Sequence, residues 1–488
     1  MSLATVCSVT VLRSLIISIM GVILSRQLAS LFGTGHSKRS FLILILILGP
    51  FLVPELIVGY AWSLISLKLV HYPMLIELIY SSLVLLKVVP VGTVCFYVSG
   101  PALISAESDF IRKSVNSTTA QISEIKTQWS FFLWKYVLQL FPVGALLFLL
   151  AFQEFEMASL IYRDSWTVWI FDAQARGVSI TQSVSYLAEP LLIELCVIIV
   201  AVFFLSRIRN QPQLELHQSV KRTHSFSSIL LWGYLFAAFF VSVVMPFSLT
   251  GWGGVLALGS LFQNQLQLVE TLGECAWGMV YGITSGIAAW GFASFFFSRN
   301  QSRQLKMLGF LLCLPGLCGS LTLGVVIAKL FLTESAYWLY DTPLALFLAL
   351  VLFLFPRAAF LKLIVLAPRE NVSFFLVRVL SQSKNQTQTL SGNLLQWDLN
   401  GKMQYWTVVI LAFWAYWDVT ISSILSPNNT TTSSVRLYGL MHYGQNSVLS
   451  AMTFLSLCIP ILISLLFFPV VKKICITALE YSTTNRTV

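Results

Sequence analysis

Long apolar runs separated by short polar stretches dominate the chain, and no run alternates apolar and polar residues as a β-strand of a membrane barrel would. An α-helix needs about 20 apolar residues to cross the hydrocarbon core of a bilayer. By that rule the pattern predicts eleven membrane spans. They lie near 8–31, 41–65, 79–104, 136–160, 190–206, 227–249, 274–298, 306–331, 342–366, 404–426 and 447–470. The predicted class is therefore an all-α, polytopic helical membrane protein.

Two stretches about 263 positions apart repeat the same landmarks. Trp134 is followed 22 residues later by Glu156, and Trp397 is followed 21 residues later by Asp418. Beyond each acid an outer loop, reading VWIF in the first copy and VRLY in the second, leads to a glycine and another apolar span, with about five extra residues in the second copy. The copies predict two pseudo-repeats that run in the same direction. Duplicated membrane halves usually line a path between them.

Polar stretches divide the two halves. Two long inner loops, roughly 105–135 and 367–403, each precede the last two spans of a half. A third polar stretch, 207–226, has the proline, glutamines and charges typical of a linker. The sequence therefore predicts a first half over 1–206 with five spans and a second half over 227–488 with six.

Lysine and arginine concentrate on one side of the predicted membrane. If the chain starts outside, 23 of the 30 basic residues fall on the inner side, as the positive-inside rule requires. The other seven are Arg13, Lys68, Lys87, Arg163, Arg176, Lys329 and Arg436. We expect an outer N-terminus and a cytoplasmic C-terminus. The net charge of +10 is then mainly an orientation signal. No basic soluble face with interleaved aromatic residues indicates nucleic-acid binding.

Motifs of catalysis and nucleotide binding are absent from the sequence. The chain has no G-x-x-x-x-G-K-[ST] phosphate loop, no H-E-x-x-H and no G-x-S-x-G, and its five histidines are scattered. We expect no catalytic, cofactor-binding or metal-ligating residues, and no enzyme. One alternative is a secondary transporter driven by an ion gradient, which would place ionisable residues deep in the spans and have short, balanced loops. Another is a polytopic membrane enzyme, which would show a membrane-proximal cluster of acids or histidines.

Two segments carry a family likeness. The first inner loop, ISEIKTQWSFFLWKYVLQLFP, places Glu124 before a proline that opens the next span, and the outer segment of the second half contains VRLYGLMHYG. These segments and the paired loops resemble the permease subunits of bacterial ATP-driven importers, in particular the fused double permeases of the ferric-iron and thiamine type. The resemblance covers almost the whole chain by architecture. Its loop motif is degenerate, because Trp129 or Ser130 stands in place of the family's glycine and the second loop lacks Glu-Ala-Ala.

The resemblance implies specific partners and a location. It implies separate ATPase subunits that bind the two inner loops, an extracytoplasmic solute-binding protein, and a bacterial inner membrane as the site of action. Ferric iron is the first guess for the solute, with thiamine, polyamines and phosphonates left open. The residues expected to couple the loops to the ATPase are Glu124, Lys126, Trp129, Trp134 and Trp397.

Acidic side chains within spans are costly, about 2.5–3.5 kcal/mol at the bilayer centre on insertion scales, and tend to face a path or a partner. Glu156 and Asp418 occupy matching positions toward the outer ends of matching spans. They are predicted either to line a path or dock a loaded binding protein, or else to cap helices near the headgroups. His442 in the outer loop is a third candidate. For Glu55 and Glu194, which each follow a proline, we favour an ordinary structural role.

Overall fold

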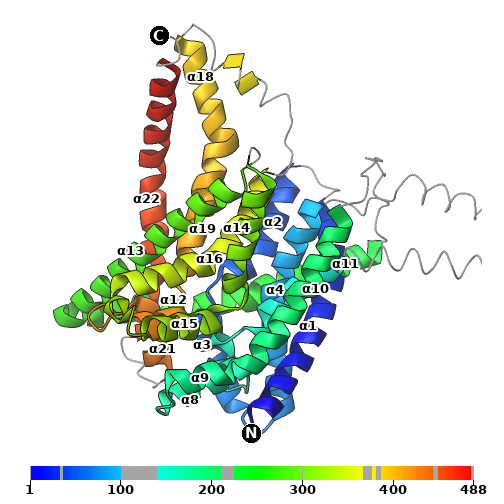
Figure 1. Ribbon diagram of the computed structural model, residues 1–488, viewed down its shortest axis with the longest axis vertical. Coiled ribbons are helices and arrows are strands. Elements are labelled where there is room, and N and C mark those ends of the chain that lie inside the picture. The colour runs from blue at the N-terminus through cyan, green and yellow to red at the C-terminus, as the bar shows by residue number, and fades with distance from the viewer. Residues whose placement is uncertain are drawn as a thin grey trace, which may run out of the picture. The chain divides into compact units, whose positions relative to one another are not determined.

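The computed structural model describes residues 2–32, 37–99, 140–209, 225–298, 301–366, 376–377, 379–380, 386–442 and 449–484 (Figure 1). Across these residues the chain is helical and contains no strand. The predicted all-α class is confirmed. Four of the predicted coupling residues, Glu124, Lys126, Trp129 and Trp134, lie outside the described residues.

Ten of the eleven predicted spans coincide with helices long and apolar enough to cross a membrane. Seven are single helices and three are pairs of helices bent at a short break. The single helices are Leu3–Ala29, Pro73–Tyr97, Leu140–Leu160, Ile229–Gln263, Gln265–Phe296, Pro343–Lys362 and Leu449–Ala478. The eleventh prediction, 404–426, covers α19 (Lys402–Tyr416) and the short α20 (Thr420–Leu425), which are separated by a break at Asp418.

The chain divides by its internal packing into two compact units, Met1–Leu249 and Thr250–Val488. The first unit holds α1 (Leu3–Phe32), α2 (Ser37–Leu52), α3 (Glu55–Lys68), α4 (Pro73–Ser99), a helix over 140–152, α7 (Glu156–Leu160), α8 (Trp166–Ala175), α9 (Ile180–Tyr186), α10 (Ala188–Arg209), α11 (Ser225–Phe239) and a π-helical segment, η1 (Phe240–Val244). The boundary falls inside α12 (Met245–Gln263).

The second unit contains the remaining helices. They are α13 (Gln265–Phe296), α14 (Arg303–Leu317), α15 (Ser320–Phe331), a 3₁₀ turn η2 (Tyr337–Leu339), α16 (Pro343–Leu366), α18 (Gln386–Gln396), a π-helical segment η3 (Trp397–Gly401), α19, α20, α21 (Ser433–His442) and α22 (Leu449–Thr484).

The predicted halves differ from these units in one helix. The sequence assigns the span that begins near 227 to the second half, whereas α11 packs on α2 in the first unit through the apolar side chains of Leu231 and Leu235. A polar linker marks a boundary along the chain. It does not say which surface the next apolar helix will cover, so the predicted limits of the halves stay a prediction.

Both units repeat one order of packed elements. In the first, α1 packs along α4, α2 and α3 form the bent pair, and α3 packs on α7 (Figure 1). In the second, α13 packs along α16, α14 and α15 form the bent pair, and α15 packs on α20. The two pseudo-repeats predicted from the tryptophan and acid landmarks are therefore visible as two copies of one helical arrangement.

Different residues break the second span in each copy. The first bend, of 76°, follows Val53 and Pro54, and a proline lacks the N–H that would continue the helix. The second bend, of 99°, lies at Gly319, whose φ of 82° is unfavourable for residues with a Cβ. A glycine five residues after each break, Gly59 or Gly324, then lets the second helix of the bent pair approach the short helix α7 or α20.

Candidate functional site: the acid turns and buried charges

A capped turn ends the fourth span of the first unit at Glu154. The Glu154 carboxylate accepts hydrogen bonds from the backbone N–H groups of Met157 (2.5 Å) and Ala158 (3.1 Å) and from the Tyr80 hydroxyl (2.6 Å). The Thr167 hydroxyl donates to the Glu154 carbonyl at 2.9 Å. These bonds satisfy the first N–H groups of α7, which have no intrahelical partner, and tie α8 to the end of the span.

The same turn recurs in the second unit around Asp418. Its Oδ2 accepts from the backbone N–H of Ile421 at 2.8 Å, three residues on, as Glu154 does from Met157. The Ser434 hydroxyl donates to the Asp418 carbonyl at 3.2 Å, and Ser434 pairs with the hydroxyl of Thr432. In the first unit the equivalent hydroxyl pair is that of Ser165 and Thr167.

This geometry corrects the predicted pairing of acids. The counterpart of Asp418 is Glu154, whereas Glu156 corresponds to Thr420 and begins α7. The hydroxyl that closes the turn lies 13 residues after Glu154 and 16 after Asp418, so the second copy carries three extra residues rather than five. Two acids within three positions cannot be told apart by spacing alone, but only one of them accepts the repeated backbone hydrogen bonds. Both paired acids cap helices, and a further role in a path stays a prediction.

Loss of either closing hydroxyl should loosen its turn. Thr167→Val and Ser434→Ala each remove a buried donor to the acid's carbonyl, and we expect each to lower the free energy of unfolding by about 1 kcal/mol. The measurement is the unfolding midpoint of the purified protein in detergent. Ser248→Ala is the control, because that exposed hydroxyl bonds only to a carbonyl of its own helix. Equal midpoints for all three variants would contradict the assignment.

A buried ion pair adjoins the first acid turn. Arg13 of α1, 7% exposed, donates from Nε and Nη2 to the two carboxylate oxygens of Glu77 at 2.5 and 3.1 Å. It also donates to the Asp164 carbonyl at 3.2 Å, and its guanidinium lies 4.9 Å from the centre of the Tyr80 ring. Tyr80 in turn donates to Glu154, so the network joins α1, α4 and the turn. Planar two-pronged pairing of this kind fixes the position of both partners.

A second buried cation lies deeper, at the break in the second span. Lys87, in the interior of α4 and 5% exposed, donates to the carbonyl of Val53, the last residue before Pro54. Glu55, Glu156 and Glu154 lie within electrostatic reach of its ammonium group. An ammonium at the C-terminal end of the half-helix α2 is favourably placed, because that end carries partial negative charge. Intramembrane charges beside a broken helix are a common setting for solute and ion sites.

The second unit lacks this buried charge. Its ion pair joins Glu274 and Arg436 at 3.8 Å, and the arginine side chain is 51% exposed. Glu274 also accepts from the Thr431 hydroxyl at 3.5 Å. Ser320 follows the break at Gly319, as Glu55 follows Pro54. The two copies thus share a backbone arrangement, but the first alone has buried cations among its described residues.

The sequence counted Arg13 and Lys87 among the seven basic residues on the outer side or at outer span ends, whereas the structure places both in buried positions within helices. Lys87 lies 14 residues from the first residue of α4, which corresponds to about 21 Å along a helix, and both side chains are buried. The available signal was that each basic residue interrupts an apolar run. The role of each basic residue depends on a partner carboxylate or carbonyl on another helix, and the spacing of residues along the chain does not identify that partner.

The remaining predicted site residues lie apart from these charges. Trp397 is buried in η3, where it packs against Phe468 with ring centres 6.0 Å apart. Gly401 faces the same indole, since a Cβ there would come within 2.4 Å of it. His442 is exposed at the end of α21 and stacks on Tyr438 at 5.9 Å. No group of three His, Cys, Asp or Glu side chains that could hold a metal ion occurs within the described ranges.

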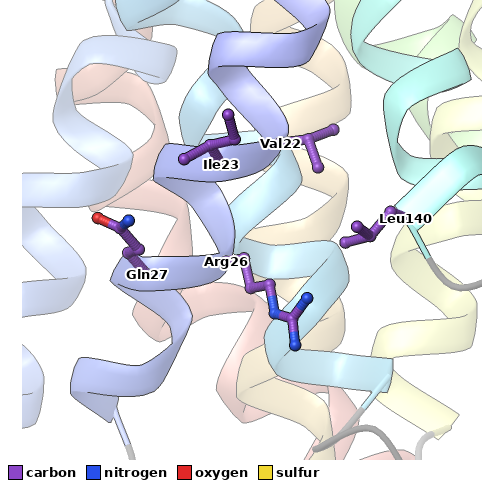
Figure 2. Close-up of a pocket in the computed structure, with 5 residues that line it drawn as sticks. All are labelled: Val22, Ile23, Arg26, Gln27 and Leu140. Carbon is purple, nitrogen blue, oxygen red and sulfur yellow. The ribbon is translucent and has the colours of Figure 1, made fainter. Parts of the chain in front are cut away.

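A groove of about 440 Å³ opens beside α1 at its predicted inner end (Figure 2). The groove is lined by Val22, Ile23, Arg26 and Gln27 of α1 and by Leu140, the first residue of the 140–152 helix. Its walls are mainly apolar, and the guanidinium and amide are its polar groups. It is remote in sequence from the acid turn, which lies at the other end of the 140–152 helix. No protein-family model, curated protein or solved structure matches this chain.

Proposed function

We propose that this membrane protein is the permease subunit of an ATP-driven importer that moves a small solute, ferric iron as the first guess, across a bacterial inner membrane. One observation carries the proposal. Each of the two parallel copies is an arrangement of five spans. In each copy a long polar segment separates the third span (α4 or α16) from the fourth, at 100–139 and at 367–385. A transporter coupled to ATPase subunits needs one such segment in each half to contact them, on the same side of the membrane.

A rigid connection at the second segment supports the proposal. α18, η3 and α19 form one uninterrupted helix of 31 residues, about 45 Å long at about 1.5 Å per residue. The hydrocarbon core is only about 30 Å thick. The polar α18 therefore extends the fourth span beyond the core, and it packs on α22, a helix of 36 residues (Figure 1). A partner that moves α18 would move the span as a rigid body.

The proposed partner is an ATP-hydrolysing subunit that binds the inner loops. We expect vanadate-sensitive ATPase activity to co-purify with the protein from its native membrane through two chromatographic steps. Deleting 120–132 should abolish that association and solute uptake while leaving membrane insertion intact. Deleting residues 212–217 from the predicted linker between the halves serves as the control. Unchanged ATPase association after the loop deletion would refute coupling through this segment.

The buried charges favour a second candidate, a carrier driven by an ion gradient. Such a carrier needs ionisable groups deep within its spans, and Lys87 and Arg13 are buried groups in the interior of helices. Uptake into membrane vesicles separates the two candidates. If a protonophore abolishes uptake and vanadate has no effect, the result supports the carrier. If vanadate abolishes uptake and the protonophore has no effect, the result supports the importer. The repeated long inner segments place the importer first.

A further inference from the structure

We propose that Glu194 is a proton-binding site inside the first unit, which holds a proton in the arrangement described here and must leave its pocket to release it. Neither ATP coupling nor a particular solute is assumed, so the proposal stands apart from the proposed function. Two acids lie near the end of the 140–152 helix: Glu154 in the turn itself, and Glu194, which is bonded by the adjacent Gln153. They differ in what surrounds them.

The environment of Glu194 suits a neutral carboxyl group. Its side chain is on α10 and is 0% exposed. One oxygen, Oε1, accepts a hydrogen bond from the Gln153 amide at 3.0 Å. The other oxygen, Oε2, is buried with no hydrogen-bond partner. An ionised carboxylate has about four acceptor positions, and leaving them empty in an apolar medium is far costlier than retaining a proton.

Glu154 provides the contrast. It is equally buried, at 5% exposure, but three donors bond its carboxylate, and the Arg13 guanidinium lies near the ring of its Tyr80 donor. Such donors stabilise the ionised form. Adjacent residues of one turn, Gln153 and Glu154, therefore serve two carboxyl groups of opposite character. One site is built to hold a negative charge and the other to avoid it.

The charged and titratable groups that face Glu194 do not change this assignment. Cys7 of α1 is within electrostatic reach of Glu194 and of Glu189, the other acid of α10. Neither neighbour is a cation, and no lysine or arginine forms an ion pair with Glu194 within the described part of the chain. The described residues hold no group of three metal-ligating side chains, so the cation that fits this single carboxyl is a proton.

A structural consequence follows from the position of Gln153. Gln153 directly precedes Glu154, so its bond to Glu194 ties α10 to the acid turn. A Glu194 that loses its proton would need water or a cation at Oε2, which has no partner in the packed position of α10. Protonation would thus favour the packed arrangement of α10, and deprotonation a displaced one.

Infrared difference spectroscopy of the full-length protein in lipid vesicles tests the proposal. A protonated carboxyl has a C=O stretching band that a carboxylate lacks and that shifts in D₂O. We expect this band at neutral pH in the wild-type protein, with the intensity of one carboxyl lost in Glu194→Gln. The controls Glu189→Gln and Glu154→Gln should retain it, since Glu189 is exposed and the Glu154 carboxyl group accepts three hydrogen bonds.

Two results would overturn the proposal. One is a wild-type protein with no protonated-carboxyl band at neutral pH, a measurement that needs no variant to fold. The other is a folded Glu194→Gln protein with an unchanged band. Absence of any co-purifying ATPase would refute the importer without affecting this result, so the two proposals fail separately.

Discussion

Replacing Arg13 with methionine is expected to destabilise the protein by about 1.5–3 kcal/mol, the range for losing a hydrogen bond to a charged group, because Arg13 is buried but its partner Glu77 is one-third exposed. The substitution leaves the Glu77 carboxylate without its two donors and the Asp164 carbonyl without its guanidinium partner. It also removes the cation beside Tyr80, which donates to the acid turn. The methionine side chain replaces most of the packing volume, so the lost interactions dominate the effect.

The measurement is the unfolding free energy in mixed micelles, with Arg436→Met as the matched control. Arg436 also pairs with a glutamate on the long helix of its unit, but at 3.8 Å and with half of its side chain exposed. Exposed pairs contribute about 0–1 kcal/mol, so the control should change little. The double variant Arg13→Met/Glu77→Gln should recover part of the loss, because Arg163, at 3.8 Å from Glu77, is the one cation left beside that carboxylate among the described residues. Similar losses for Arg13→Met and Arg436→Met would show that the buried network adds no stability.

Replacing Gly282 with alanine is expected to cost about 1–3 kcal/mol, the range for forcing extra atoms into a packed core. A Cβ at Gly282 would come within 2.6 Å of the Ala412 carbonyl oxygen on α19. Because that neighbour is backbone rather than the end of a flexible side chain, α13 and α19 would have to separate. These two helices pack closely along their lengths, so a local shift would spread to other contacts. Small residues at such crossings are what allow membrane helices to approach.

Gly291→Ala on the same helix provides the opposite result. A Cβ there meets nothing within 4 Å, and alanine is favoured over glycine in a helix by about 0.5–1 kcal/mol. We therefore expect Gly291→Ala to be neutral or stabilising, and the two variants to differ in sign. The check is thermal unfolding of both purified variants in the same detergent. Destabilisation of equal size would contradict the assignment of the Gly282 effect to the close approach of α13 and α19.

The apolar pattern was sufficient for most of the architecture. Burial of about 20 consecutive apolar residues requires a helix in a bilayer, so ten spans could be located without any contact. The pattern failed at 404–426, where α19 ends before Asp418 and a short helix follows. Hydropathy is averaged over many residues and does not detect a break of three residues inside an apolar run.

The candidate site was predicted less well than the fold. Asp418 was identified, but its partner was placed on Glu156, although Glu154 accepts the equivalent backbone hydrogen bonds. Arg13, Tyr80 and Lys87 were not recognised as site residues, because each acquires its role from a group on another helix. The predicted coupling residues of the first loop stay a prediction, since they lie outside the described residues.

The sequence by itself determined that this is a helical membrane protein with two parallel repeats, because apolar length and repeated landmarks are properties of the chain order. Only the tertiary structure decided which ionisable side chains are paired and which are isolated. Glu154 and Glu194 are the same residue type at similar burial, yet one has three donors and the other has one. Two of the Glu154 donors are backbone N–H groups of the following turn, but Tyr80, and the Gln153 amide that bonds Glu194, come from other segments of the chain. The free energy of a buried charge depends on such neighbours.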